Sequence, residues 1–316
     1  MDLNSNLKER FLTLIENKKV SHSYIIAGGE GAGKLDFALY CAKAILCGGK
    51  PCGKCDDCRK AEKDSHPDII VINRGETQSF KIDEVRRVTE SIYVPPNASK
   101  KGSKKIYILD HCENMTVQAQ NALLKAFEEP PEYVVFFILT EKKEALLPTV
   151  RSRASLFTVS PMEFSKLEET LKKKYPKETE ENINNAVRLS EGFFGRAVKF
   201  LEKSSKEEIK VALSLANYIL FEKSGYKTAV LLNGYKTKRE AAVRILFLVL
   251  YAVRDTILFK NGDESFCLLS CEDAERFSFN TMSYLSELSD LIISSAESLE
   301  NNGNYTSCIA KLCGAI

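Results

Sequence analysis

The stretch Tyr24–Leu35, YIIAGGEGAGKL, decides the fold of this 316-residue chain. Tyr24–Ala27 is a short apolar run typical of a buried strand, and apolar residues recur at helical spacing from Asp36 to Leu46. Residues 28–34 between them match the phosphate-loop pattern G-x-x-x-x-G-K, here Gly28, Gly33 and Lys34. In such a loop, backbone N–H groups surround phosphate oxygens and the lysine reaches the terminal phosphates. A strand, a phosphate loop and a helix in this order predict an α/β fold.

The rest of the first half repeats the alternation of strands and helices. Helix-period segments are expected at residues 3–18, 82–94 and 117–129, the last ended by Pro130 and Pro131. Further strands are expected at residues 68–73, 106–109, 134–139 and 155–159. Near-continuous apolar strands that alternate with helices predict a five-stranded parallel sheet covered on both faces.

The pattern changes after Pro161, because no convincing strand follows. Charged helical segments lead to long amphipathic stretches at about 206–222, 237–260 and 280–300, with a short last one from Tyr305. We therefore expect three domains: 1–160 with the sheet, 161–205 as a small helical lid, and 206–316 as an all-α domain.

The composition excludes several classes of protein. Apolar residues are 44% and charged residues 28%, which rules out a disordered or fibrous chain. The net charge of +2 does not point to a nucleic-acid partner. The longest apolar run, Ile245–Val253, has nine residues, whereas a membrane span needs ~20. The N-terminus has no signal pattern, so we expect a cytoplasmic protein without membrane contact.

Two positions depart from a working nucleotide hydrolase. The residue after the loop lysine is normally Ser or Thr, whose hydroxyl holds Mg²⁺, but here it is Leu35. Asp110 ends the strand at 106–109 and would be the metal-side carboxylate, or simply a cap at a strand end. The next residue is His111, where hydrolases place a Glu that polarises water, and Glu113 would face elsewhere if the strand continued. These changes predict poor or no hydrolysis, and leave nucleotide binding itself open.

Four of the ten cysteines lie within twelve residues: Cys47, Cys52, Cys55 and Cys58. Two overlapping C-x-x-C spacings, with turns at Gly48, Gly49 and Pro51, allow the four sulfurs to converge. Four thiolates make a closed tetrahedral zinc site without an open position for catalysis. We expect structural zinc, with an iron–sulfur cluster, free thiols or disulfides as the alternatives. The metal would fold an insertion that has few apolar residues.

These motifs together resemble clamp-loader proteins of the AAA+ class. The most specific is residues 121–131, which fit Asn-Ala-Leu-Leu-Lys-x-x-Glu-Glu-Pro-Pro, after a phosphate loop with a cysteine insertion behind its helix. Ser152-Arg153-Ala154 resembles the Ser-Arg-Cys motif of the family, with Ala in place of Cys. The resemblance implies an AAA+ fold with a zinc-binding insertion, a helical lid, and a C-terminal collar domain for oligomerisation. The resemblance is specific over residues 20–160, approximately, and weaker in the rest of the chain.

The resemblance also implies roles for single residues. Arg153 would be an arginine finger that acts in trans at the ATP site of a neighbouring subunit. Its alternative is a surface salt bridge, and Arg151 is a weaker candidate. Thr140 matches the first sensor position of the family, which contacts the γ-phosphate in active relatives, and its plainer interpretation is a hydroxyl cap at a strand end. Arg196 resembles the second sensor, and its plainer interpretation is an exposed cation at the start of a helix. The lysines at 100, 101, 104 and 105 could touch DNA phosphates or simply be solvated.

The functional hypothesis is a non-hydrolysing subunit of the bacterial replicative DNA polymerase III clamp loader. It would assemble with the gamma/tau and delta subunits and act on the sliding clamp and primed DNA through that complex. We expect no ATPase activity from the isolated chain. In the cell it would be one part of a larger DNA polymerase assembly. The alternatives are an active gamma/tau-like clamp-loader ATPase and a stand-alone DNA-binding zinc protein.

Overall fold

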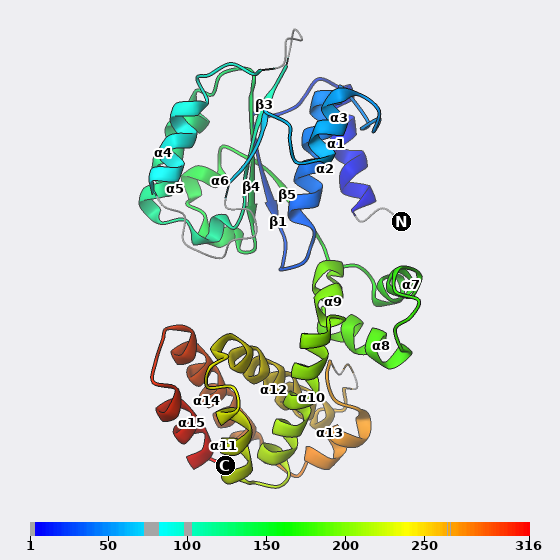
Figure 1. Cartoon of the computed structure of the whole chain (residues 1–316), viewed down its shortest axis with the longest axis vertical. Coiled ribbons are helices and arrows are strands. Elements are labelled where there is room, and N and C mark those ends of the chain that lie inside the picture. Colours follow the sequence, from blue (N-terminus) through cyan, green and yellow to red (C-terminus); the bar gives the residue numbers. More distant parts are fainter. Residues whose placement is uncertain (1–3, 73–81, 98–102, 264, 266) are drawn as a thin grey trace. The chain divides into compact units, whose positions relative to one another are not determined.

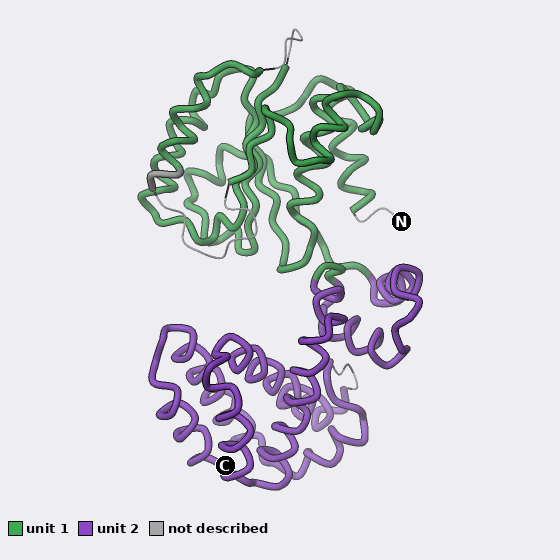
Figure 2. Tube along the Cα trace, in the orientation of Figure 1, with its two compact units in different colours: residues 1–162, 193–195 green, residues 163–192, 196–316 purple. Residues whose placement is uncertain are grey.

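The computed structural model describes residues 4–72, 82–97, 103–263, 265 and 267–316. The chain divides into two compact units (Figure 2). Unit 1 comprises residues 1–162 and 193–195, and unit 2 comprises residues 163–192 and 196–316. The finer division into a lid at 161–205 and a collar at 206–316 stays a prediction.

Unit 1 is built on a five-stranded parallel sheet with strand order β2-β3-β4-β1-β5. All residues of β1, β3 and β4 are buried, because these interior strands are covered on both faces. Ala27 pairs with Thr140 on one side and Thr158 on the other, so three strands end together at one edge of the sheet. The strands are β1 (Ser23–Ala27), β2 (Ile69–Ile72), β3 (Lys105–Leu109), β4 (Val134–Thr140) and β5 (Ser155–Thr158).

Helices cover the two faces of this sheet (Figure 1). Alternate strand residues face opposite sides: Tyr24 and Ile26 belong to a core with Phe37, whereas Ile25 belongs to a core with Phe127. The first core lies under α1 (Ser5–Glu16) and α2 (Lys34–Cys47), with α3 (Asp56–Glu62) against α2. The second lies under α4 (Ile82–Ser91), α5 (Val117–Glu128) and α6 (Pro148–Arg151), and the short helices η1 (Cys112–Asn114) and η2 (Lys143–Ala145) follow β3 and β4.

Among its described residues, unit 2 contains helices joined by turns and loops, and no strand. Its core is formed mainly by α10, α12 and α14, which correspond to the three long stretches predicted from the sequence. The short α11 and α13 were not expected. The helices are α7 (Phe164–Lys174), α8 (Glu180–Leu189), α9 (Phe194–Phe200), α10 (Lys203–Leu220), α11 (Gly225–Asn233), α12 (Arg239–Lys260), α13 (Cys271–Phe277), α14 (Met282–Glu300) and α15 (Tyr305–Gly314).

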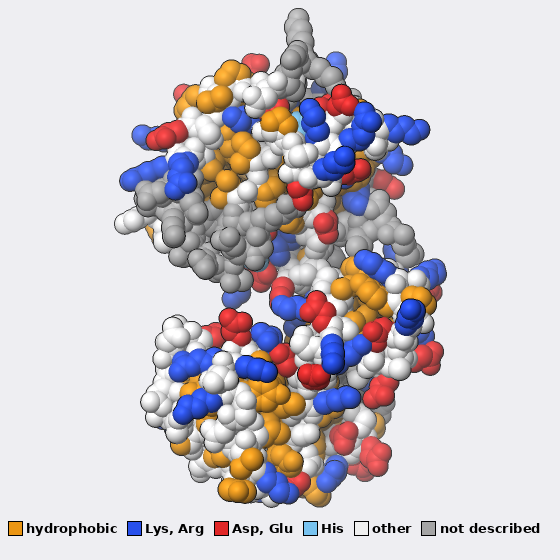
Figure 3. All heavy atoms as spheres, viewed as in Figure 1, with side chains coloured by type: hydrophobic (Ala, Val, Ile, Leu, Met, Phe, Trp, Pro, Cys, Tyr) orange, Lys and Arg blue, Asp and Glu red, His pale blue; other side chains and the backbone are white. Residues whose placement is uncertain are grey.

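The surface carries charges of both signs. On the face drawn in Figure 3, Lys and Arg side chains lie among Asp and Glu side chains on both units. Within the described parts of the chain, none of the helices combines the length and apolar character needed to span a bilayer. The parallel sheet, the cysteine insertion after α2 and the all-helical second half confirm the fold class predicted from the sequence.

Candidate nucleotide site and metal centre

The glycine loop joins the end of β1 to the start of α2, as the sequence predicts. Gly33 is the N-cap of α2 and has φ +77°, a left-handed conformation that favours glycine. The loop is fastened to the sheet because the Gly28 N–H donates to the carbonyl of Thr140 at 3.1 Å. Gly28 and Thr140 therefore meet at the carboxyl edge of the sheet.

Lys34 points back into its own loop. Its Nζ donates to the carbonyl oxygens of Gly28 at 2.8 Å and Gly29 at 3.1 Å. Nζ also lies 3.7 Å from the Glu141 carboxylate, and the residue is only 7% exposed. Glu141 follows β4 directly and was not singled out from the sequence. The lysine that would reach terminal phosphates is thus satisfied by groups of the chain itself.

Residues 193–195 lie against this loop, although they are distant in sequence. The Gly195 N–H donates to the Gly31 carbonyl at 2.9 Å. A Cβ added to Gly29 would come within 2.7 Å of the Phe193 ring, so the ring leaves no room for a side chain there. No periodicity or spacing in the sequence pointed to this contact, since it depends on the tertiary fold.

The predicted metal-side residue, Asp110, directly follows β3. Asp110 is buried, and its carboxylate accepts a hydrogen bond from the His111 N–H at 3.0 Å. Leu35 packs into the core beneath α2, so no hydroxyl stands at the magnesium position. Thr140 is buried, and its hydroxyl donates to the Lys142 carbonyl at 3.0 Å, which makes it a strand-end cap in this structure.

The expectation that Glu113 would face elsewhere was conditional on a continuing strand, and it does not apply because β3 ends at Leu109. His111 adopts φ +53°, and the chain turns into η1. Glu113 then accepts from the Glu141 N–H at 3.1 Å, while its other oxygen lies 3.2 Å from His111 Nδ1. His111, Glu113 and Glu141 offer ligand atoms within 4.8 Å of one another. These groups already partner each other and, through Glu141, Lys34.

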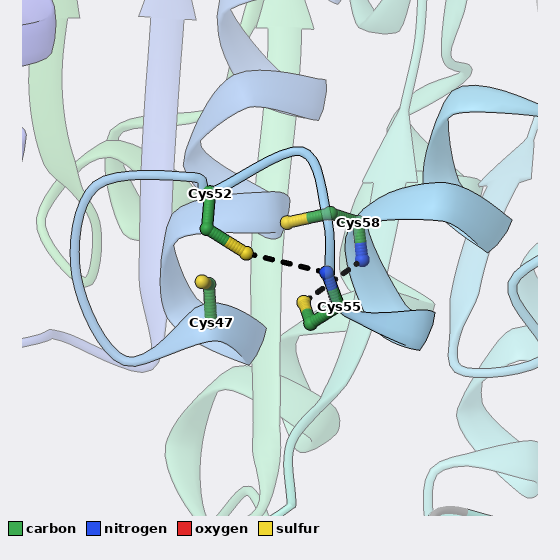
Figure 4. Close-up of side chains that lie close together, drawn as sticks. All are labelled: Cys47, Cys52, Cys55 and Cys58. Carbon is green, nitrogen blue, oxygen red and sulfur yellow. Dashed lines mark hydrogen bonds between the residues drawn. The ribbon is translucent and has the colours of Figure 1, made fainter.

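The four predicted cysteines converge within unit 1 (Figure 4). Their sulfur atoms all lie within 4.8 Å of one another. Cys47 ends α2, Cys55 is the N-cap of α3, and Cys58 lies in the first turn of that helix. In a tetrahedral zinc site with Zn–S of ~2.3 Å, sulfurs are ~3.8 Å apart. The donor set and its spacing therefore fit a four-thiolate metal site.

Backbone groups around the cluster favour thiolate at one of its members. The N–H groups of Lys54 and Cys55 donate to Cys52 Sγ at 3.4 and 3.3 Å, and they lower the pKa of the Cys52 thiol to about 6. The Cys58 N–H donates to Cys55 Sγ at 3.4 Å. Burial raises the pKa of Cys58 to about 12, and a bound cation would oppose that effect.

Arg153 follows α6 in the turn that leads into β5. Its guanidinium donates to the carboxylate of Glu128 at 2.9 Å and to the carbonyl of Thr149 at 3.0 Å. The side chain remains 36% exposed. Arg151, the weaker candidate, is exposed at the end of α6. The structure therefore places Arg153 at the surface of unit 1 in an ordered ion pair.

Arg196 is held within unit 2. Its guanidinium donates to Glu191 at 3.1 Å and to the Tyr251 hydroxyl at 2.6 Å, and that hydroxyl donates to the second Glu191 oxygen at 3.0 Å. Burial raises the pKa of Tyr251. These three residues join α9 to α12. The second-sensor role of Arg196 stays a prediction.

Two of the lysines considered for DNA contact have other partners. Lys105 is buried, and its Nζ donates to the carbonyls of Ser91 at 3.0 Å and Val94 at 3.2 Å. Lys104 donates to the Glu132 carbonyl at 2.5 Å. Lys100 and Lys101 lie outside the described residues.

Comparison with known proteins places these features in a family. The family model described as "DNA polymerase III, delta subunit" matches residues 3–163. DNA polymerase III subunit delta' of Bacillus subtilis is 27% identical over 79% of this chain and 76% of its own length. DNA polymerase III subunit tau of Escherichia coli is also 27% identical, over 69% of this chain, which spans only 33% of that longer protein.

Among solved structures, the DNA polymerase III gamma subunit-related protein of Thermotoga maritima is matched at 22% identity, with 97% of each chain covered and a TM-score of 0.46. The family match covers about half of the chain and agrees with the resemblance to clamp-loader proteins found in the sequence. This chain therefore belongs to the DNA polymerase III delta-subunit family of clamp-loader-related proteins.

Proposed function

We propose that this chain is a delta'-type subunit of a clamp loader that does not hydrolyse ATP itself. The observation that carries the proposal is the position of Lys34, whose ammonium is bound by Gly28 and Gly29 of its own loop. Two further features support it: Leu35 offers no oxygen to Mg²⁺, and His111 stands where a hydrolase has Glu. The residues of a nucleotide loop are present, but the groups for chemistry are missing or engaged.

The main alternative is an active gamma/tau-like ATPase, and a steady-state assay on the isolated chain separates the two. We expect no turnover above background, with or without Mg²⁺. Direct titration with a fluorescent ATP analogue measures binding separately, because the loop could hold nucleotide without hydrolysing it. Robust turnover that Lys34→Ala abolishes would favour the gamma/tau-like alternative.

In this proposal, Arg153 acts as an arginine finger at the ATP site of a neighbouring gamma/tau-type subunit. Its surface position at the α6–β5 turn and its charge support the role. An arginine finger stabilises charge on the transferring phosphoryl group, and losing one costs ~10³–10⁵ in rate. Gamma/tau and delta subunits are the partners that we propose, and the complex would act on the sliding clamp and primed DNA in the cytoplasm.

The test is the ATPase activity of the reconstituted complex with Arg153→Ala, with Arg151→Ala as the matched control. We expect Arg153→Ala to assemble normally but to depress DNA-stimulated hydrolysis strongly, while Arg151→Ala stays near wild type. Unchanged hydrolysis with Arg153→Ala would remove the finger role.

We also propose that Cys47, Cys52, Cys55 and Cys58 hold one structural zinc ion. The four sulfurs would complete its coordination, so the ion would stabilise the insertion and leave no position open for a substrate.

Nucleic-acid affinity tests the remaining alternative, a stand-alone DNA-binding zinc protein. Tight, salt-sensitive DNA binding by the isolated chain would support that alternative, and we expect only weak binding.

A further inference from the structure

The backbone of Arg153 is fixed on both sides of its side chain. Its N–H donates to the Val150 carbonyl at 3.2 Å, which closes the turn after α6. Its carbonyl accepts from the hydroxyl of Ser23 at 2.6 Å, and Ser23 is the fully buried first residue of β1. The strand that leads to the glycine loop therefore also fastens the backbone of Arg153.

Two acceptors then hold the guanidinium. One Nη donates to the carbonyl of Thr149, the second residue of the short helix α6, and the other donates to Glu128. A guanidinium has five N–H donors in a planar arrangement. Because these contacts engage two of the five, donors remain for a phosphate group on another molecule.

Glu128 belongs to the most specific motif of the sequence. It is the last residue of α5, just before Pro130 and Pro131 end the run. The same helix also holds the segment before α6, since Gln120 accepts from the Leu147 N–H at 2.7 Å. Helix α5 therefore makes two contacts with this region. Gln120 binds the segment before α6, and Glu128, at the end of α5, binds Arg153.

We infer that Glu128 is a positioning residue for Arg153, which it holds in the orientation that presents the guanidinium to a neighbouring molecule. This inference rests on the proposed arginine-finger role. Both partners are substantially exposed, 36% for Arg153 and 51% for Glu128. Exposed pairs are weak, equivalent to a bias of about 1.5- to 5-fold. Such a pair limits the rotamers of a long side chain and still lets the guanidinium shift onto a phosphate.

The test compares four variants in the reconstituted complex: Glu128→Gln, Glu129→Gln, Arg153→Ala and the double variant Glu128→Gln/Arg153→Ala. Glutamine keeps the shape of glutamate but removes the charge. We expect Glu128→Gln to lower the kcat of the partner ATPase about two- to fivefold with little change in KM for ATP. Glu129→Gln removes the same charge from the adjacent position, and we expect it to match wild type.

The double variant distinguishes positioning from a general structural effect. If Glu128 acts through Arg153, Glu128→Gln has no further effect once Arg153 is Ala. An additional loss in that background, or an equal loss with Glu129→Gln, would overturn the inference. A strong effect of Arg153→Ala with none of Glu128→Gln would overturn it too, while leaving the finger role intact.

A measurement on the free chain tests the pair without the complex. The Arg153 Nε–Hε signal in an NMR spectrum should shift and broaden with Glu128→Gln, and should be unaffected by Glu129→Gln. An unchanged Arg153 signal in Glu128→Gln would show that the pair does not order the side chain. If Arg153→Ala leaves the complex fully active, both the proposed function and the positioning role fail.

Discussion

The ammonium of Lys34 lies 2.8 Å from the carbonyl oxygen of Gly28, inside the loop that both residues help to form. A lysine that contacts bound phosphates would direct its ammonium to the phosphate oxygens that the loop surrounds. Here the Lys34 side chain is buried, and its Nζ also lies 3.7 Å from a carboxylate oxygen of Glu141. Lys34 therefore supports the shape of the loop.

Lys34→Met should destabilise unit 1, because methionine fills similar space but removes the charged donor to the Gly28 carbonyl and leaves the Gly29 carbonyl with the Ala32 N–H alone. The expected loss in the free energy of unfolding is about 1–3 kcal/mol, the range for buried groups that lose a charged partner. Urea denaturation measures it. Lys125→Met is the control, because Lys125 is exposed on α5. Equal stability of the two variants would contradict this structural role of Lys34.

Purified protein should contain about one zinc ion per chain by elemental analysis. Removing the metal with a chelator should lower the unfolding temperature, since a ligand present at 100 times its Kd stabilises the folded state by ~2.7 kcal/mol. For a domain of this size that corresponds to roughly 5–11 °C. Cys58→Ser should lose the metal and Cys271→Ser, an exposed cysteine of unit 2, should keep it. Full zinc content in Cys58→Ser would exclude the four-cysteine site.

Arg196→Ala and Tyr251→Phe should show coupled effects on the stability of unit 2. The guanidinium donates to the Tyr251 hydroxyl at 2.6 Å, and both groups contact Glu191. In a double-mutant cycle we expect a coupling energy of about 1 kcal/mol. Tyr226→Phe serves as the control for losing a phenol hydroxyl, since Tyr226 is 81% exposed. Additive effects would mean that the three residues do not act as one network.

The pair of Glu178 and Lys206 should make unit 2 sensitive to acid. Lys206 donates to Glu178 at 2.6 Å and lowers the pKa of that carboxyl below its ordinary value. A carboxyl with a depressed folded pKa stabilises the protein above its unfolded pKa, ~4.3, and loses this contribution as the pH falls through the folded pKa. Glu178→Gln should therefore be less stable than wild type at pH 7 and approach it near pH 3.

Unfolding curves at several pH values would measure that convergence. Glu180→Gln is the matched control on the same segment, because the Glu180 side chain is 84% exposed and its contact with Lys172 is longer, at 3.4 Å. A difference between Glu178→Gln and wild type that stays constant from pH 7 to pH 3 would contradict the linkage.

Local patterns in the sequence were sufficient for much of the fold. Apolar runs such as Ile106–Leu109 predicted buried parallel strands, because strands covered on both faces need apolar residues throughout. The spacing from Cys47 to Cys58 predicted four converging sulfurs, since a short segment limits how far its thiols can separate. The short helices α11 and α13 were missed because they offer too few turns for a clear period.

The contacts made by the candidate site residues were harder to predict. The phosphate-loop pattern selected Lys34 as a candidate, and the family resemblance selected Arg153 and Arg196. Neither gave any indication of the partners of these side chains. The expectation for Glu113 depended on a continuing strand, and the left-handed conformation of His111 turns the chain instead. A single residue with positive φ changes the direction of the chain, and such a change has no periodic signal.

The amino-acid sequence by itself determined the order of strands and helices, the glycine loop, the cysteine insertion and the missing magnesium hydroxyl at Leu35, because each depends on neighbours within a few residues. Only the tertiary structure decided that Lys34 faces Glu141, that Phe193 lies over Gly29, and that Glu128 holds Arg153. These pairs are 25 to 164 residues apart. The packing of helices against the sheet brings the two members of each pair together, and a local sequence pattern does not predict that packing.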